Sequence, residues 1–178
     1  MNNGQLSLCT PDKRLIAVCG LFCPACSLFI GTKEDPERLK GLAGRLQRPI
    51  EEVECHGCRS EKRGFFCKEH CKMVKCATEK GLDFCGECTE YPCAALREFQ
   101  AQMPHRIELW KSQERIKEAG YEKWYMEMIE HYSCSECGTL NSPYDMACRK
   151  CGATPSCKYV SLHKDEIIQQ MVKIKPLA

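Results

Sequence analysis

Apolar side chains recur at helical spacing through the second half of the chain. One set would share a face of a helix that follows Gly120: Tyr121, Trp124, Tyr125, Met128, Ile129 and Tyr132. An earlier set predicts a helix from about Pro92 to Met103: Ala95, Leu96, Phe99 and Met103. Pro104 breaks or restarts this pattern, which continues through Ile107, Trp110 and Ile116 to Gly120. A last short helix is expected from His163 to Ile174.

The first half carries one strong helix signal. Asp35, Pro36 and Glu37 are an N-cap, a proline at the first helical position and an acid in the first turn. The helix should run to about Gln47, because Pro49 follows. Strands are expected only at Leu15–Val18 and in a cysteine-rich segment near the C-terminus. The pattern therefore predicts a small α-rich fold with a minor β component.

Composition shows how such a fold is stabilised. Hydrophobic residues make up 43% of the 178, but 17 of them are cysteines, which leaves few aliphatic and aromatic side chains for a large core. Small cores usually need disulfides or metals. We find no signal peptide, and the apolar stretch from Leu15 to Ile30 is too interrupted to cross a membrane. We therefore expect a cytoplasmic protein with no membrane partner, whose reduced cysteines bind metal.

Four cysteines near the C-terminus have the spacing of a zinc ribbon. Cys134 and Cys137 precede Gly138, and after ten residues Cys148 and Cys151 precede Gly152. Zinc favours four tetrahedral thiolates, and a glycine after each pair lets the turn close with φ > 0. An iron site of the rubredoxin type would use the same ligands. Basic side chains in this segment (Arg149, Lys150, Lys158) are offset by Glu136 and Asp145, so no clear phosphate-binding face is predicted.

Two further sites are predicted upstream, for a total of two to three Zn²⁺ per chain. The first would use Cys23, Cys26, Cys55 and Cys58, and the second Cys67, Cys71, Cys85 and Cys88. Cys19 is a rival ligand for the first site, and Cys76 and Cys93 are rivals for the second. His56 or His70 could also replace a thiolate, although a solvent-facing histidine is the favoured interpretation of each.

The spacing of Cys19, Cys23 and Cys26 also matches the iron–sulfur loop of radical-SAM enzymes. Those enzymes need a large partial barrel of strand–helix units after the loop. A helix and another cysteine pair follow here instead, and too little chain remains. This interpretation is rejected.

Four elements together resemble a known family. They are Cys19-Gly20-Leu21 with Cys23 and Cys26; Cys55-x-Gly57-Cys58; Cys71-x4-Cys76-Ala77-x2-Lys80-Gly81; and Cys85-x2-Cys88-x2-Tyr91-Pro92-Cys93. Over roughly residues 12 to 132 the chain resembles small prokaryotic cysteine-rich proteins catalogued as domain of unknown function thirty-seven ninety-five. The resemblance implies bound zinc and a bacterial or archaeal cytosol, and it implies no substrate.

The expected organisation is a zinc-stapled helical domain at 12–132, a ribbon at 133–157 and a C-terminal helix or tail at 158–178. All-thiolate sites are closed and structural, so the residues favour a binding or adaptor module over an enzyme. Its partner is unknown and could be a protein. An iron–sulfur or thiol redox protein is the first alternative, with Cys93 as a candidate reactive thiol at a helix start. A nucleic-acid binder is the second, disfavoured because the net charge is only +2.

Overall fold

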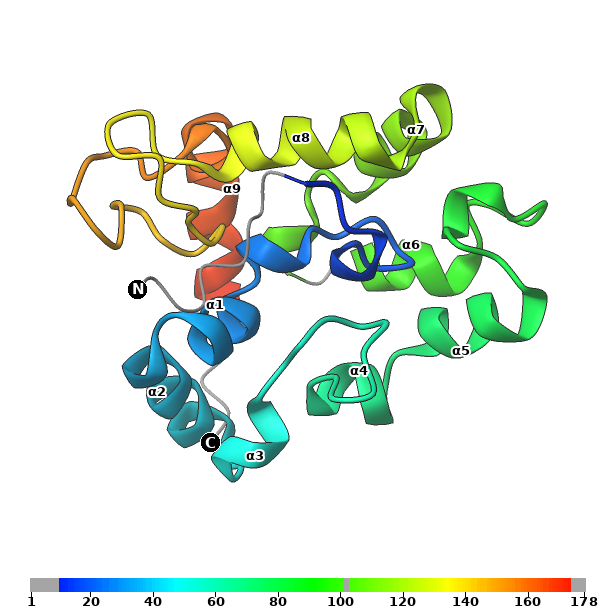
Figure 1. Ribbon diagram of the computed structural model, residues 1–178, viewed down its shortest axis with the longest axis horizontal. Coiled ribbons are helices and arrows are strands. Elements are labelled where there is room, and N and C mark those ends of the chain that lie inside the picture. The colour runs from blue at the N-terminus through cyan, green and yellow to red at the C-terminus, as the bar shows by residue number, and fades with distance from the viewer. Residues whose placement is uncertain (1–9, 101–102, 174–178) are drawn as a thin grey trace.

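The computed structural model (Figure 1) describes residues 10–100 and 103–173, and the regular secondary structure in these ranges is almost entirely helical. Its α-helices are α1 (Ser27–Lys33), α2 (Pro36–Leu46), α3 (Ile50–Val53), α4 (Phe65–Glu69), α5 (Lys72–Lys80), α6 (Ala94–Gln100), α7 (Leu109–Ala119), α8 (Tyr121–Tyr132) and α9 (Lys158–Lys173). The described residues also form four 3₁₀ turns. Two precede α1, η1 (Lys13–Leu15) and η2 (Cys23–Ala25), and two lie on either side of α6, η3 (Cys85–Glu87) and η4 (Pro104–Arg106). The α-rich fold class expected from the sequence is confirmed.

The strongest helix signals hold in the structure. The Asp35 side chain accepts a hydrogen bond from the Arg38 N–H and so caps α2. Helix α8 spans the predicted range, and Gly120 separates it from α7. Pro104 opens the η4 turn rather than continuing a helix. Helix α9 begins five residues before His163, and the predicted end at Ile174 lies outside the described residues.

The strand expected at Leu15–Val18 is wrong. Leu15 ends η1, and Ile16 makes only an isolated antiparallel bridge with Phe22. A second isolated bridge joins Ser133 to Leu140 in the ribbon. Within residues 10–100 and 103–173 no longer ladder forms, because these segments turn back after a few residues to bring cysteines together.

The main hydrophobic core forms around Phe22. Its ring packs edge-on against Trp124 and Tyr125 at centroid distances of 5.9 and 5.2 Å, and it stacks on Tyr132 at 5.9 Å. Tyr132 in turn stacks on Tyr159 of α9 at 5.2 Å. The N-terminal segment, α8 and α9 therefore share one core. Trp124 and Tyr125 of α8 are core residues, with 1% and 0% of their area exposed, so they are not available to bind a partner.

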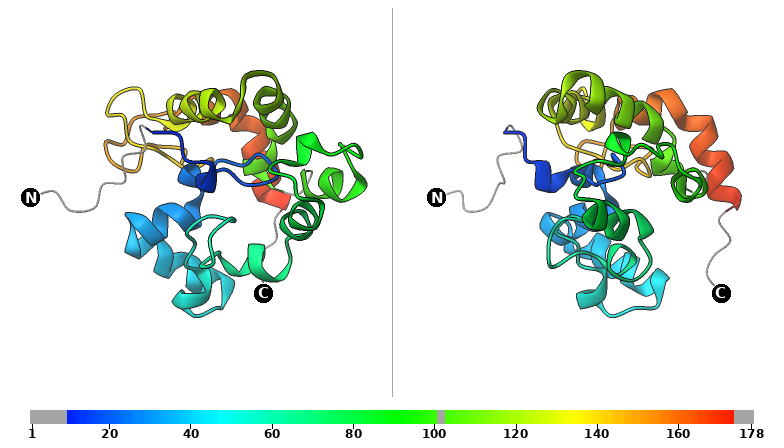
Figure 2. Two further views of the ribbon diagram at one scale, coloured as in Figure 1. Left: turned by 45° about the vertical axis from the view of Figure 1, so that its right-hand side comes forward. Right: turned by 90° about the vertical axis from the view of Figure 1, so that its right-hand side faces the viewer.

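Two smaller clusters lie away from this core. One gathers cysteines with aliphatic side chains, including Cys19, Cys58, Met73, Leu96 and Leu109. The other joins α2 to α3 through Leu39, Ala43 and Val53. Figure 2 shows α1–α3 at one end of the molecule and α7–α8 at the other, with the segment before α1 between them.

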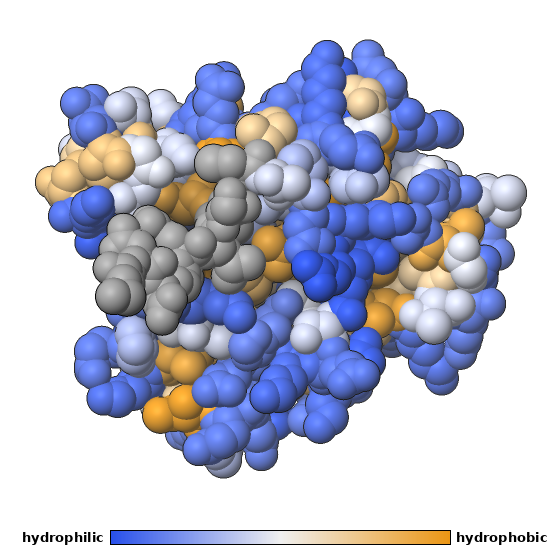
Figure 3. Space-filling view, in the orientation of Figure 1, coloured by the Kyte–Doolittle hydropathy of each residue, from blue (hydrophilic) through white to orange (hydrophobic). Residues whose placement is uncertain are grey.

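The face seen in Figure 3 is mainly hydrophilic, with small separate hydrophobic patches. Within residues 10–100 and 103–173, the exposed large hydrophobic side chains are Ile50, Met126 and four on α9: Leu162, Ile168, Met171 and Val172. None of the helices in the described ranges is long and apolar enough to cross a membrane.

Candidate metal centre

The four ribbon cysteines converge on one point. Their sulfur atoms all lie within 4.8 Å of one another, and among the described residues this is the one such group of His, Cys, Asp or Glu side chains. Cys134 Sγ is 3.7 Å from Cys151 Sγ, and Cys137 Sγ is 3.6 Å from Cys148 Sγ. Each close pair joins one knuckle to the other. The arrangement can hold a metal ion between two chain segments.

The two knuckles have the same backbone geometry. The Gly138 N–H donates to Cys134 O, and the Gly152 N–H donates to Cys148 O, both at 2.9 Å. Gly138 and Gly152 have φ of +69° and +77°. The positive φ expected after each cysteine pair is therefore present, and it lets each turn close beneath its sulfur atoms.

Asn141 is a buried residue at the centre of the ribbon. Its Nδ2 donates to Thr139 O at 2.8 Å and to Ser156 O at 3.0 Å, and it lies 3.6 Å from Cys148 Sγ. Its Oδ1 accepts the Arg149 N–H at 3.0 Å. The side chain thus connects the loop between the knuckles to both of its ends. In the sequence, the Asn-Ser-Pro run at 141–143 is only a turn signal.

Hydrogen bonds favour the thiolate form of two ribbon cysteines, Cys148 and Cys137. Against the opposing effect of burial, the N–H groups of Cys151 and Lys150 and the Asn141 amide lower the pKa of Cys148 to about 6. The Thr139 hydroxyl and N–H lower the pKa of Cys137. Because the thiolate is the form that binds metal, these contacts suit the group to a cation.

The ribbon is fixed to the helical part by polar contacts. Arg38 of α2 donates to Asp145 Oδ1 at 2.9 Å, and the Ser27 and Ser142 hydroxyls are 2.7 Å apart. Arg149 forms an ion pair with Glu34. The Arg149 guanidinium is therefore engaged within the protein.

The first predicted upstream set lies in one neighbourhood. Burial and the thiols of Cys58, Cys55 and Cys26, in that order, raise the pKa of Cys23. A Cβ placed on Gly57 would be 3.8 Å from Cys23 Sγ. Unlike the ribbon sulfurs, these four sulfurs do not all lie within 4.8 Å of one another. The site stays a prediction.

The second predicted set has neighbours in the first, because the thiols of Cys58 and Cys55 also act on Cys67. Cys67, in α4, hydrogen-bonds to Cys71, which caps α5; this contact raises the pKa of Cys67 and lowers that of Cys71. Burial raises the pKa of Cys85 to about 12, followed in effect by the thiols of Cys93, Cys76, Cys71 and Cys88. The rival ligands Cys93 and Cys76 therefore raise the pKa of Cys85 more than Cys71 and Cys88, its predicted partners, do.

Three other candidates have distinct surroundings. The pKa of Cys19 is raised by burial and then by the thiols of Cys58, Cys71 and Cys85, so it lies between the two predicted sets. His56 Nδ1 is 2.8 Å from Lys33 Nζ. His70 keeps 57% of its side-chain area exposed beside Glu69, in keeping with the solvent-facing interpretation.

These observations define a small helical, cysteine-rich protein with a four-cysteine group that can hold a metal ion. Residues 15–98 match the sequence profile of the family described as "Protein of unknown function (DUF3795)". The resemblance found in the sequence is confirmed over this range, which ends well before residue 132. Neither the curated proteins nor the solved structures contain a match to the chain.

Proposed function

We propose that the protein is a zinc-binding module of the cytoplasm, in which zinc has a structural role and the surface binds a partner. The four converging ribbon sulfurs carry this proposal. A site of four thiolates leaves no open coordination position for water or substrate, so its zinc would stabilise the fold rather than act in a reaction. The proposal extends to the upstream sets, for a total of two to three zinc ions.

A binding role is supported by the apolar side chains that α9 exposes. Leu162, Ile168 and Met171 are 56%, 44% and 45% exposed, and Val172 is 80% exposed. Solvent-facing apolar groups concentrated on one helix are typical of interaction surfaces. The partner class that best fits them is a protein.

Metal content tests the proposal. Protein purified without added metal is analysed for zinc and iron per chain. Two to three zinc ions and no iron are expected. Iron near or above one per chain would contradict the structural-zinc role and favour the redox alternative, because iron–thiolate centres are coloured and redox-active.

A matched pair of variants locates one of these ions. Cys148 and Cys157 are both 4% exposed, but only Cys148 belongs to the ribbon group. Cys148→Ser should lose one zinc per chain, whereas Cys157→Ser should keep the full content. Equal zinc content in the two variants would contradict a ribbon zinc. Cys23→Ser and Cys85→Ser test the two upstream sets in the same way.

Salt dependence tests the nucleic-acid alternative. Binding to DNA or RNA that weakens steeply between low and high salt would support that alternative. The engagement of Arg149 with Glu34 leads us to expect no such binding.

A further inference from the structure

Two histidines share one carboxylate on the side of α9 that faces α7 and α8. His131 Nε2 is 2.8 Å from Glu108 Oε2, and His163 Nε2 is 2.9 Å from Glu108 Oε1. The three residues belong to the N-cap of α7, the end of α8 and the first half of α9. The His131 side chain is 9% exposed, that of Glu108 is 10% exposed and that of His163 is 20% exposed. Tertiary packing alone brings them together.

The His131 ring nitrogen points to a missing ligand. Its Nε2 is buried and lies 2.8 Å from Glu108 Oε2 as an ion pair, but this contact lacks the directed geometry of a hydrogen bond. A buried polar atom without a directed hydrogen bond costs about 1–3 kcal/mol, so such atoms in native proteins usually serve a site. A metal ion between the two side chains would replace the proton that Nε2 holds against the Glu108 carboxylate, and would bind both groups.

Glu108 is suited to the same role. Although burial opposes ionisation, contacts with His131 and His163 lower the pKa of its carboxyl to about 2. It is therefore an anion at neutral pH, as a metal ligand must be. Lys111 Nζ, 3.4 Å from Oε1, is the competing cation, but its side chain is 74% exposed and can move away.

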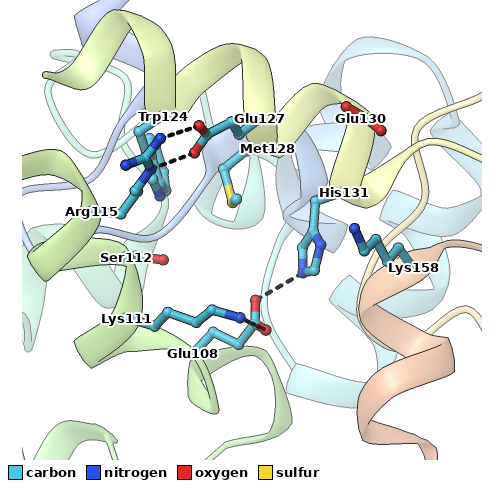
Figure 4. A pocket seen from close by; sticks show the side chains of 10 residues that line it. All are labelled: Glu108, Lys111, Ser112, Arg115, Trp124, Glu127, Met128, Glu130, His131 and Lys158. Atoms are coloured by element: carbon cyan, nitrogen blue, oxygen red, sulfur yellow. Dashed lines mark hydrogen bonds and ion pairs between the residues drawn. The ribbon is translucent and has the colours of Figure 1, made fainter. Parts of the chain in front are cut away.

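A pocket of about 310 Å³ opens beside the cluster. His131 and Glu108 point toward each other at its edge, with Lys158 of α9 on the other side (Figure 4). Trp124 and Met128 form part of its wall. An ion held by three protein ligands here would keep a coordination position open to solvent, unlike the closed ribbon.

We propose that Glu108, His131 and His163 form a second kind of metal site, which binds a divalent first-row transition metal through two imidazoles and one carboxylate. This ligand set is preferred by zinc, iron(II), cobalt(II) and nickel(II). The three ligand atoms are less tightly gathered than the ribbon sulfurs. Binding therefore draws the two imidazoles around the carboxylate and displaces Lys111.

Cobalt(II) titration of the full-length protein tests this site, after the cysteine sites have been loaded with zinc and weakly bound metal has been removed by dialysis against a mild chelator. The expected result is about one additional cobalt per chain, with visible d–d absorption and no sulfur-to-cobalt charge-transfer band. His163→Gln and Glu108→Gln should weaken this binding at least tenfold, while Lys111→Ala should keep or strengthen it. The zinc retained after this dialysis should be the same in all three variants, because cysteine holds it, and this separates the site from the thiolate sites of the proposed function.

Failure has a distinct signature. No additional cobalt on the wild-type protein, or equal binding to His163→Gln, would overturn the proposal and leave the cluster as a purely structural contact. A charge-transfer band would also overturn it, because it would place the cobalt on cysteine. His163 is the most exposed of the three ligands, so its variant remains informative if Glu108→Gln does not fold.

Discussion

Arg38 Nη2 lies 2.9 Å from Asp145 Oδ1, and this contact joins α2 to the cysteine ribbon across 107 positions of sequence. The side chains are 16% and 14% exposed, so the pair is largely shielded from water. Arg38 also contacts Asp35, the N-cap of its own helix. The Arg38 guanidinium therefore links the start of α2 to the ribbon and helps to hold the ribbon in position.

We expect Arg38→Ala to lower the free energy of unfolding by about 2 kcal/mol, because it leaves Asp145 partly buried without its partner. Urea denaturation measures the change. Lys40→Ala is the control: the Lys40–Glu37 pair is 60% and 80% exposed and should contribute less than about 0.5 kcal/mol. Equal effects of the two variants would contradict a coupling role for Arg38.

Asn141→Ala should lower both the stability of the ribbon and its affinity for metal. The substitution removes donors to Thr139 O and Ser156 O and the amide beside Cys148 Sγ, at a fully buried position. Loss of these bonds is expected to cost about 2–3 kcal/mol. Zinc release to a chromophoric chelator should become faster by tenfold or more. Ser135→Ala, at an exposed position of the first knuckle, should release zinc at the wild-type rate.

Gly152→Ala isolates the cost of the left-handed backbone. No atom lies within 4 Å of a Cβ placed on Gly152, so the substitution causes strain without a clash. We expect a loss of about 1–2 kcal/mol, partly restored in Gly152→Asn. Gly41→Ala is the control, because Gly41 lies within α2 with open space around it and should be stabilising by about 0.5–1 kcal/mol. Thermal unfolding of the zinc-loaded protein measures both; a neutral Gly152→Ala would contradict the backbone argument.

His105 should remain neutral in the folded protein at pH values well below the usual pKa of histidine. Burial, and secondarily Arg106, lowers the pKa of His105 to about 3, and its Nδ1 lies 2.7 Å from the Tyr144 hydroxyl. A depressed histidine pKa means that the unfolded chain binds the proton first. Stability is therefore fully present above about pH 6.5 and is lost as the pH falls toward 3.

The ring retains some exposed area, so we expect a total loss of about 2 kcal/mol from this group rather than the full value for its shift. Nuclear magnetic resonance can follow the His105 ring protons from pH 8 to 5.5, a range in which thiolate-bound metal should be retained. No titration is expected. A midpoint near 6.5 would contradict the prediction. The same ring protons in the urea-unfolded protein are the control and should titrate at about 6.5.

The sequence by itself determined the features that depend on neighbours in the chain. Asp35 and Pro36 predicted the start of α2, and the apolar period after Gly120 predicted α8, because caps and helical faces are local properties. The paired Cys-x-x-Cys-Gly segments predicted the ribbon group for the same reason, since each knuckle closes through its own backbone. The family resemblance also lay in short motifs, between residues 15 and 98.

Only the tertiary structure decided which distant groups meet. The Leu15–Val18 strand failed because β-propensity needs a partner strand, and the fold provides one bridge with Phe22 instead. Cys19 lies near Cys58, Cys71 and Cys85 through packing that no spacing encodes. Glu108, His131 and His163 carry no shared motif and meet because Tyr132 and Tyr159 stack and dock α9 against α8. Such contacts arise from core packing between segments far apart in sequence, whereas local patterns report only on the segment that contains them.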